Sequence, residues 1–347
     1  MKVSFLRDLI SIPSPSGEED AVAEYLVEQM AALGFQAQRD EAGNAVGSIG
    51  DPGAKRVIVL LGHMDTVPGH ISVRKEEGRL YGRGAVDAKG PLATFVLAAA
   101  QAAPRLNGAR VLVIGAVEEE THGRGARHLA STMPPPYCAV IGEPSGWDGV
   151  TLGYKGVLSL SYRLSQASGH SAGAEPGPAE KAVSFWNKLN MYAEEHEPNR
   201  PGRFYTLDPA LRAFNTFSDG LHDGVDMDIV MRLPPGLQAS DLKQKLQTWR
   251  DGARLTFYPS DPPFQTEKNI PLVRAMLRAI RAHGGRPRFK LKTGTSDMNI
   301  VGPAWGCPIV AYGPGDSSLD HTPHEHIQIE EFLRGVDVLS HALETLA

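Results

Sequence analysis

The sequence has few cysteines, no excess of basic residues and no long apolar run. Its two cysteines, Cys138 and Cys307, lie far apart without a Cys-x-x-Cys pattern, which argues against a disulfide framework or a thiolate zinc site. The 35 Lys and Arg against 40 Asp and Glu leave a net charge of -5 and no electrostatic footprint for nucleic acid. No signal-peptide core or membrane-spanning run is present. We therefore expect a cytoplasmic protein that binds neither nucleic acid nor membranes.

The chain is long enough for two domains, because 347 residues with 41% hydrophobic content exceed what one core usually holds. Buried strands alternating with helices predict an α/β domain with a mostly parallel sheet flanked by helices, built from residues 1–155 and 263–347. Residues 156–262 change to the order βαββαβ, which predicts an inserted, ferredoxin-like α+β domain.

Near the N-terminus, two local patterns predict supporting structure. Ser16-Gly17-Glu18-Glu19 is typical of a capping box, here opening a helix that Gly34 closes. Residues 35–49 alternate enough to predict an edge hairpin. Farther on, residues 79–87 form a glycine-spaced segment that we expect to be a loop leading into an alanine-rich helix over residues 89–103.

The central stretch of the chain is Val57–Pro68. Five apolar residues predict a strand buried on both faces, which stops at Gly62 with His63 and Asp65 just beyond it. Ligand sites of open parallel sheets lie outside the carboxyl ends of the strands. A carboxylate that accepts one ring N–H also fixes a histidine for metal binding. Alone, the His63 and Asp65 pair is weak evidence for a metal site, because a lone histidine more often has a structural role.

Further acids and histidines follow other predicted strand ends. Three glutamates, Glu118, Glu119 and Glu120, come directly after residues 111–117, Glu143 follows residues 139–141, and His321 comes after residues 308–312. Each has a plain alternative, such as a solvated charged face. Asp87, at the start of the alanine-rich helix, can equally be an N-cap.

Taken together, these side chains form a cluster that needs cations. Converging carboxylates repel and raise one another's pKa unless a metal neutralises them. Nitrogen and oxygen donors without sulfur suit Zn²⁺, Co²⁺ or Mn²⁺, and five ligands exceed what one catalytic ion takes, so two ions are implied. Such a pair can activate water for attack on a carbonyl.

Five motifs in this order resemble those of the M20 metallopeptidases and amidohydrolases over nearly the whole chain. They are residues 62–68 (GHMDTVP), 82–90 (GRGAVDAKG), 118–120 (EEE), 142–144 (GEP) and 321–323 (HTP). The resemblance implies His63 and Glu143 as ligands of one metal, Glu120 and His321 as ligands of the other, and Asp87 as the bridge. The expected ions are zinc, with cobalt as an alternative.

The resemblance also assigns roles beyond the ligands. It implies Glu119 as the general base, which takes a proton from the attacking water and returns it to the leaving amine, and Asp65 as the residue that orients His63. Glu118 stands where Asp is common in the family. A cis peptide is expected between Asp87 and Ala88.

For the inserted domain, the resemblance implies a lid that also forms a homodimer. Residues 169–172 resemble a motif whose histidine, here His170, reaches a partner's active site. We expect substrate contacts from His170, Arg232, Thr295 and Ser296. The Asn-x-Val-Pro element common before the third lid strand is absent from residues 218–225, which puts contacts from that loop in doubt.

Within the family, residues 143–147, 152–156, 292–299 and 312–316 most resemble the hydrolases that release lysine or ornithine from the C-terminal glutamate of a small acidic amino-group carrier protein in lysine and arginine biosynthesis. N-acetylornithine deacetylase and succinyl-diaminopimelate desuccinylase activities are the alternatives. A metal-loaded binding protein without turnover is a third hypothesis, and Glu119 argues against it, since a binder needs no spare base. An acidic substrate requires basic residues at the rim, for which Lys155, Arg163, Arg200 and Arg203 are the candidates. The alternative is that these four are scattered surface charges.

Overall fold

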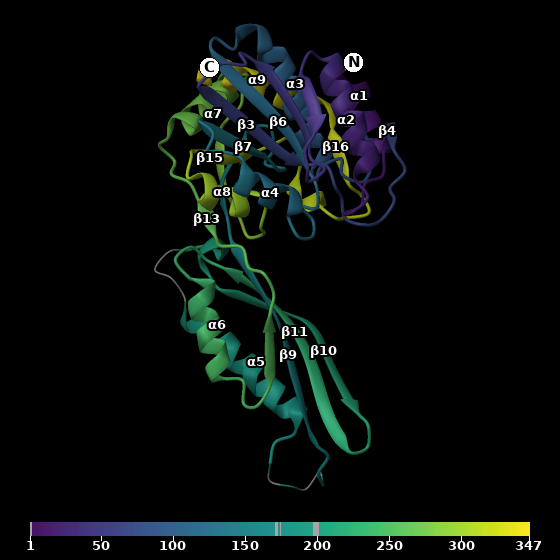
Figure 1. The fold of residues 1–347 in the computed structure, drawn as a ribbon, viewed down its shortest axis with the longest axis vertical. Helices are drawn as coiled ribbons and strands as arrows, with labels where there is room; N and C mark the ends of the chain where they lie inside the picture. Colours follow the sequence, from purple (N-terminus) through teal and green to yellow (C-terminus); the bar gives the residue numbers. More distant parts are fainter. Residues whose placement is uncertain (1, 171–172, 174, 197–200) are drawn as a thin grey trace. The chain divides into compact units, whose positions relative to one another are not determined.

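The computed structural model describes residues 2–170, 173, 175–196 and 201–347. Contacts divide the chain into two compact units. Unit 1 contains Met1–Gly153, Thr266–Leu291 and Ser296–Ala347, and unit 2 contains Tyr154–Gln265 and Lys292–Thr295 (Figure 1). Each unit has its own hydrophobic core. Among the described residues, no helix is long and apolar enough to cross a membrane.

The main sheet of unit 1 is parallel in its centre and antiparallel toward its edges. Among the described residues, the first seven of its nine strands, in spatial order, are β1 (Gln36–Arg39), β2 (Ala45–Gly50), β6 (Ala109–Ala116), β3 (Arg56–His63), β7 (Cys138–Gly142), β15 (Ile309–Tyr312) and β8 (Gly149–Tyr154). The strands β6, β3, β7 and β15 run parallel to one another. The carboxyl ends of these four strands therefore meet at one edge of the sheet.

The strand β3 forms the middle of this parallel region because its residues suit burial on both faces. Residues 58–63 are all buried, as the apolar run predicts. Gly62 lies opposite Gly142 in the register, and a Cβ on Gly142 would come within 2.9 Å of the Gly62 Cα atom. Small residues are thus required where the two strand ends approach each other, immediately before His63 and Glu143.

Helices cover the sheet of unit 1. They are α1 (Lys2–Ser11), α2 (Asp20–Ala32), α3 (Lys89–Ala102), α4 (Arg124–Thr132), α7 (Pro271–Ala282), α8 (Met298–Trp305) and α9 (Ile329–Leu346), with short 3-10 turns at Ala103–Arg105 and Ser317–Leu319. The apolar helix α3 packs on β3, β6 and β7 and contacts α1 and α9, whereas α4 packs against α8. The predicted α/β class with a mostly parallel sheet is confirmed.

Two sequence-based expectations about unit 1 are wrong. The helix α2 begins at Asp20, and Ser16 does not cap it, because the Ser16 hydroxyl donates to Asp65 Oδ2 at 2.7 Å. The segment expected to be a loop contains β5 (Arg79–Tyr81), which pairs with β4 (Arg74–Glu76) and β16 (His326–Gln328) in a small antiparallel sheet. The edge hairpin of β1 and β2 is confirmed.

Unit 2 has the predicted order βαββαβ. Its elements are β9 (Gly156–Ala167), α5 (Pro178–Glu195), β10 (Asp208–Ser218), β11 (His222–Leu233), α6 (Ala239–Thr248) and β12 (Arg254–Phe257), with a 3-10 turn at Arg203–Tyr205. The antiparallel sheet has the order β10-β11-β9-β12. Its core includes Tyr162 against Phe185 of α5, with ring centroids 5.0 Å apart. The short strands β13 (Phe264–Gln265) and β14 (Arg288–Lys292) occur where the chain passes between the units.

Candidate functional site

His63 and Asp65 lie at the carboxyl end of β3, and both side chains are buried. The His63 Nδ1 atom is 3.3 Å from Asp65 Oδ1 and 3.1 Å from the Asp65 carbonyl oxygen. Both acceptors face the same ring nitrogen, so they fix the orientation of the ring. The other nitrogen, Nε2, is directed toward Asp87.

Asp87 lies between two histidines. Its Oδ1 atom is 3.2 Å from His63 Nε2, and its Oδ2 atom is 3.0 Å from His321 Nε2. The helix α3 begins at Lys89 with Ala88 as its N-cap residue, so the N-cap alternative for Asp87 does not hold. The expected cis peptide between Asp87 and Ala88 is confirmed.

The three glutamates after β6 do not form a solvated face. The backbone N–H groups of Glu119 and Glu120 donate to Asp65 Oδ1 and Oδ2, each at 3.1 Å. The Glu120 Oε1 atom lies 3.1 Å from His321 Nε2. Asp65 therefore connects two parts of the site, because it contacts His63 through its side chain and carbonyl and anchors the glutamate turn as well.

The pKa values of these groups move as expected for a cluster of acids around histidines. Burial and the nearby carboxylates of Glu143, Asp297 and Glu120 raise the pKa of Glu119 well above its usual 4.5. Hydrogen bonds to Asp87 and Glu120 raise the pKa of His321 to about 10. Burial lowers the pKa of His63. The hydrogen bonds of the His63 ring with Asp65 and Asp87 outweigh the effect of burial, so the pKa of His63 lies well above 6.5. The cluster thus attracts positive charge.

Two groups of side chains in the described part of the chain can each hold a metal ion. One contains His63, Glu119 and Glu120, and the other contains Asp87, Glu120 and His321, with ligand atoms in each group within 4.8 Å of one another. These imidazole and carboxylate donors fit zinc or cobalt. Glu143 belongs to neither group, although it is buried at the end of β7 and influences the pKa of Glu119.

The expected substrate residues are less closely grouped. Arg232 donates to the Thr295 hydroxyl at 3.2 Å, and both belong to unit 2. Ser296 belongs to unit 1, is 4% exposed, and its hydroxyl accepts a hydrogen bond from Met298 N at the start of α8. His170 is exposed in unit 2, and Ser171 and Ala172 of its motif lie outside the described residues.

Of the four residues expected at a basic rim, Lys155 needs correction. Lys155 is fully buried, with its Nζ atom 2.7 Å from Asp208 Oδ2 and 2.9 Å from the Arg203 carbonyl oxygen, so it is a structural cation. Arg163 pairs with Asp226 at 3.1 Å. Arg203 is exposed, and Arg200 lies outside the described residues. A lysine beside glycines gives no sequence signal of burial, which explains the error.

Comparison with known proteins places this geometry in a family. Residues 59–345 match the sequence profile of peptidase family M20/M25/M40. The chain belongs to this family. The match covers most of the chain and includes every acid and histidine of the site described above.

Curated relatives of this M20 chain carry a more specific name. A protein of Deinococcus radiodurans named [LysW]-lysine hydrolase is 44% identical over 98% of this chain and 96% of its own length. A protein of Saccharolobus islandicus named [LysW]-lysine/[LysW]-ornithine hydrolase is 30% identical over 98% of this chain and 94% of its own length.

Solved structures of the M20 family have the same fold. An M20 metallo-carboxypeptidase of Sulfolobus solfataricus is similar with a TM-score of 0.81 at 18% identity, over 99% of both chains. The Bacillus subtilis YXEP protein, described as a dinuclear metal binding peptidase, is similar with a TM-score of 0.77 at 12% identity, over 99% of this chain and 96% of that one. At these identities the likeness concerns the fold.

Proposed function

We propose that this M20 hydrolase releases lysine, and ornithine where it is carried, from the C-terminal glutamate of a LysW-type amino-group carrier protein. The observation that supports the substrate most directly is the 44% identity to a [LysW]-lysine hydrolase over 98% of the chain. The acid-rich site at the carboxyl end of the sheet supports amide hydrolysis. In this reaction the amide C–N bond breaks, water supplies the oxygen of the new carboxylate, and a proton goes to the leaving amine.

The proposal includes two divalent ions, zinc or alternatively cobalt. His63 and Glu143 would hold one ion, Glu120 and His321 the other, and Asp87 would hold both. The placement of Asp87 supports this, since each of its oxygens faces a different histidine nitrogen. When bound, such ions polarise a carbonyl oxygen and lower the pKa of water.

Glu119 is the proposed general base. Its backbone is fixed by Asp65, and its side chain lies in the acid-rich part of the site, where burial raises its pKa. A carboxyl group with a raised pKa is better matched to proton transfer near neutral pH. Glu119 accepts the proton of the attacking water and delivers it to the leaving amine of the departing lysine.

Unit 2 is proposed to bind the carboxylate of the carried amino acid through Arg232, with Thr295 holding the guanidinium group. No carboxylate pairs with Arg232 among the described residues, and burial and the nearby Arg212 lower its pKa. An incoming carboxylate would relieve both costs. His170 and Ser296 are further proposed substrate contacts.

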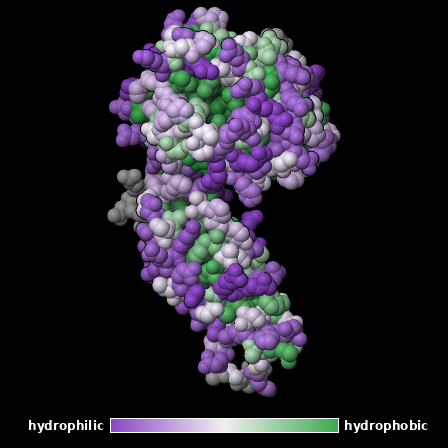
Figure 2. Space-filling model, viewed as in Figure 1, coloured by the Kyte–Doolittle hydropathy of each residue, from purple (hydrophilic) through white to green (hydrophobic). Residues whose placement is uncertain are grey.

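A homodimer through unit 2 is part of the proposal. The strand β10 is an edge strand, and Leu211 and Phe217 on it are each 40% exposed. Edge strands with exposed apolar residues pair readily with another chain. Figure 2 shows residues of high hydropathy on the surface of this unit. Light scattering of the wild type and of a Leu211→Lys variant tests the proposed homodimer.

Cytoplasmic location is also proposed, and cell fractionation tests this location.

The test of the proposed function is a side-by-side assay of the purified, zinc-loaded protein. Carrier-linked lysine, carrier-linked ornithine, N-acetylornithine and N-succinyl-diaminopimelate are offered at equal concentration, and released amino acid is quantified. We expect release from the carrier-linked substrates with kcat/KM far above that of the small substrates. Preferential cleavage of N-acetylornithine or the succinyl substrate would instead assign the alternative activities. Tight zinc binding without any turnover would make the chain a binding protein.

A further inference from the structure

Glu118, the first of the three glutamates, has an unusual backbone conformation. Its φ angle is 58°, in the left-handed region that residues other than glycine rarely adopt. The next two residues are the proposed base Glu119 and the proposed ligand Glu120. The direction in which both side chains leave the turn depends on this residue, so the contacts that hold Glu118 bear on the geometry of the site.

The left-handed residue lets three successive N–H groups bind two carboxylates. Glu118 N donates to Glu19 Oε1 at 3.1 Å, while the N–H groups of Glu119 and Glu120 donate to the two oxygens of Asp65. Successive N–H groups around a left-handed residue form a concave anion site of this kind. Glu19 is 4% exposed and also accepts from Gly17 N at 2.9 Å, so its carboxylate is fixed in turn.

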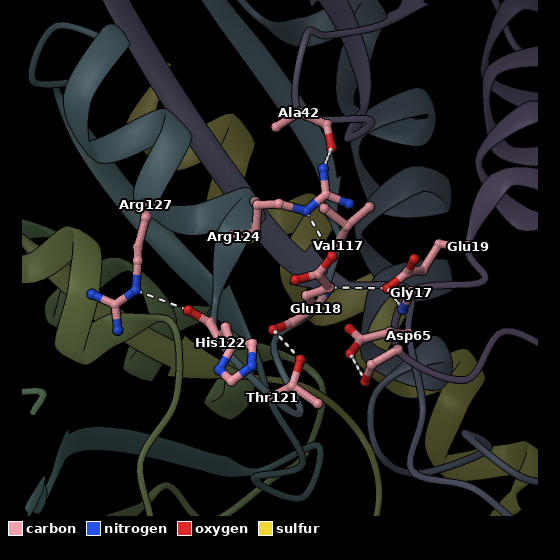
Figure 3. Close-up of polar contacts among 12 residues, drawn as sticks. Gly17, Glu19, Ala42, Asp65, Val117, Glu118, Thr121, His122, Arg124 and Arg127 are labelled. Atoms are coloured by element: carbon pink, nitrogen blue, oxygen red, sulfur yellow. Dashed lines mark hydrogen bonds and ion pairs between the residues drawn. The ribbon is translucent and has the colours of Figure 1, made fainter. Parts of the chain in front are cut away.

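The side chain of Glu118 is held by Arg124, the first residue of α4. The Arg124 Nε atom lies 2.7 Å from Glu118 Oε1, and Arg124 Nη1 donates to the Ala42 carbonyl oxygen (Figure 3). A cation in the first turn of a helix is disfavoured by the helix dipole. Its presence there is explained by the contact with Glu118, whose carbonyl also accepts from Gly123 N at 2.6 Å.

We propose that Arg124 is a positioning residue for the catalytic turn: its ion pair with Glu118 holds residue 118 in the left-handed conformation and thereby aims Glu119 and Glu120 into the site. The inference rests on the proposed function, which assigns the roles of Glu119 and Glu120. Neither Arg124 nor Glu118 contacts the substrate in this account. Both act through the backbone that they fix.

The first test compares Arg124→Gln with Arg124→Lys and with the matched control Arg127→Gln. Arg127 lies one turn along α4, and its Nε atom donates to the His122 carbonyl oxygen, away from Glu118 (Figure 3). For Arg124→Gln we expect a loss of kcat of about 10-fold or more, as for other residues that orient a metal site, with KM nearly unchanged. Arg124→Lys should recover part of the loss. Unchanged kcat in Arg124→Gln, or an equal loss in Arg127→Gln, would overturn the proposal.

The second test asks whether the backbone conformation is what matters. Glycine adopts the left-handed region without steric cost, whereas alanine does not. Glu118→Gly should therefore retain more kcat than Glu118→Ala, and adding Glu118→Gly to Arg124→Gln should restore most of the lost kcat. Equal impairment by glycine and alanine would contradict the proposal. Should Arg124→Gln fail to fold, this pair of Glu118 variants carries the test alone.

A third readout does not depend on turnover. Apparent zinc affinity of each apoprotein is measured by competition with a chelator, and Arg124→Gln should bind zinc about 10-fold more weakly than wild type and Arg127→Gln. Equal affinities in all three proteins would overturn the proposal. If wild type cleaves no carrier-linked lysine, the proposed function fails, whereas the ranking of zinc affinities still decides the role of Arg124.

Discussion

The two units contain clusters of opposite charge. In unit 1, acids gather around His63 and His321 and raise the pKa of both rings. In unit 2, the buried Lys155 forms an ion pair with Asp208. Burial lowers the pKa of Lys155 most, and the nearby Arg203 and Arg232 lower it further. The acids of unit 1 favour added cations, and the bases of unit 2 favour an added anion.

This contrast gives a physical division of tasks. A hydrolase for a carried amino acid has to activate water and to recognise a carboxylate. In our proposal, the acid-rich site of unit 1 would serve the first task and the basic residues of unit 2 the second. Substitutions in unit 1 should therefore act mainly on kcat and metal binding. Substitutions in unit 2 should act mainly on KM and stability.

The largest effect is expected for Glu119→Gln, which removes proton transfer and keeps the size of the side chain. We predict a loss of kcat of at least ~10²-fold with zinc content equal to that of wild type. Steady-state kinetics and metal analysis on the same preparation check this. Near-normal turnover at full metal content would show that Glu119 is not the base.

Asp65→Asn should have the next largest effect. The amide replaces one acceptor oxygen with a donor and so conflicts with the N–H groups of Glu119 and Glu120 and weakens the hold on His63. We predict a loss of roughly 10- to 100-fold in kcat or zinc affinity. Ser16→Ala, which removes only the hydrogen bond to Asp65 Oδ2, is the milder control. An Asn variant with wild-type kinetics and zinc affinity would exclude the anchoring role.

In unit 2, Arg232→Gln should raise KM for carrier-linked lysine roughly 10-fold, because a hydrogen bond between charged groups is lost. Its effect on kcat should be smaller. The exposed Arg254 on β12 provides the control variant Arg254→Gln. A selective fall in kcat with unchanged KM would show that Arg232 does not act in substrate binding.

The smallest effect is expected for Lys155→Met. The change removes the Lys155 donor from Asp208 and from the Arg203 and Thr206 carbonyl oxygens. The Thr206 hydroxyl still lies 2.7 Å from Asp208 Oδ1, and the Asp208 side chain is 24% exposed. We predict a loss of about 1 kcal/mol in the free energy of unfolding. Urea unfolding measures it, with Lys188→Met on the exposed side of α5 as control. A variant as stable as wild type would mean that the buried ion pair contributes nothing.

Strand-end positions explain why much of unit 1 is predictable from sequence. An apolar run that ends in His63 or in three glutamates marks the same sheet edge, and parallel pairing brings the ends together. The contacts that support those residues are not predictable in this way. Glu19 and Ser16 match a capping box, yet they bind Glu118 N and Asp65 through long-range contacts that no local spacing encodes.

In unit 2, the order of the elements is predictable from the sequence, but the burial of individual charged residues is not. Its βαββαβ order follows from alternation and helix periodicity, and the observed elements confirm it. The burial of Lys155 does not follow, since whether a lysine at a strand end faces solvent depends on the segment packed over it, here residues 203–208. Recognition residues in this unit are therefore the weaker part of a sequence-based prediction.

The central claim is hydrolysis of the amide between the carrier's C-terminal glutamate and lysine. The most direct measurement incubates the zinc-loaded protein with carrier-linked lysine in ¹⁸O-labelled water and follows both products by mass spectrometry. We predict free, unlabelled lysine and a carrier that keeps its terminal glutamate with one labelled oxygen in the new carboxylate. Release of a glutamyl-lysine dipeptide from a shortened carrier, or an intact carrier beside hydrolysed N-acetylornithine, would contradict the account.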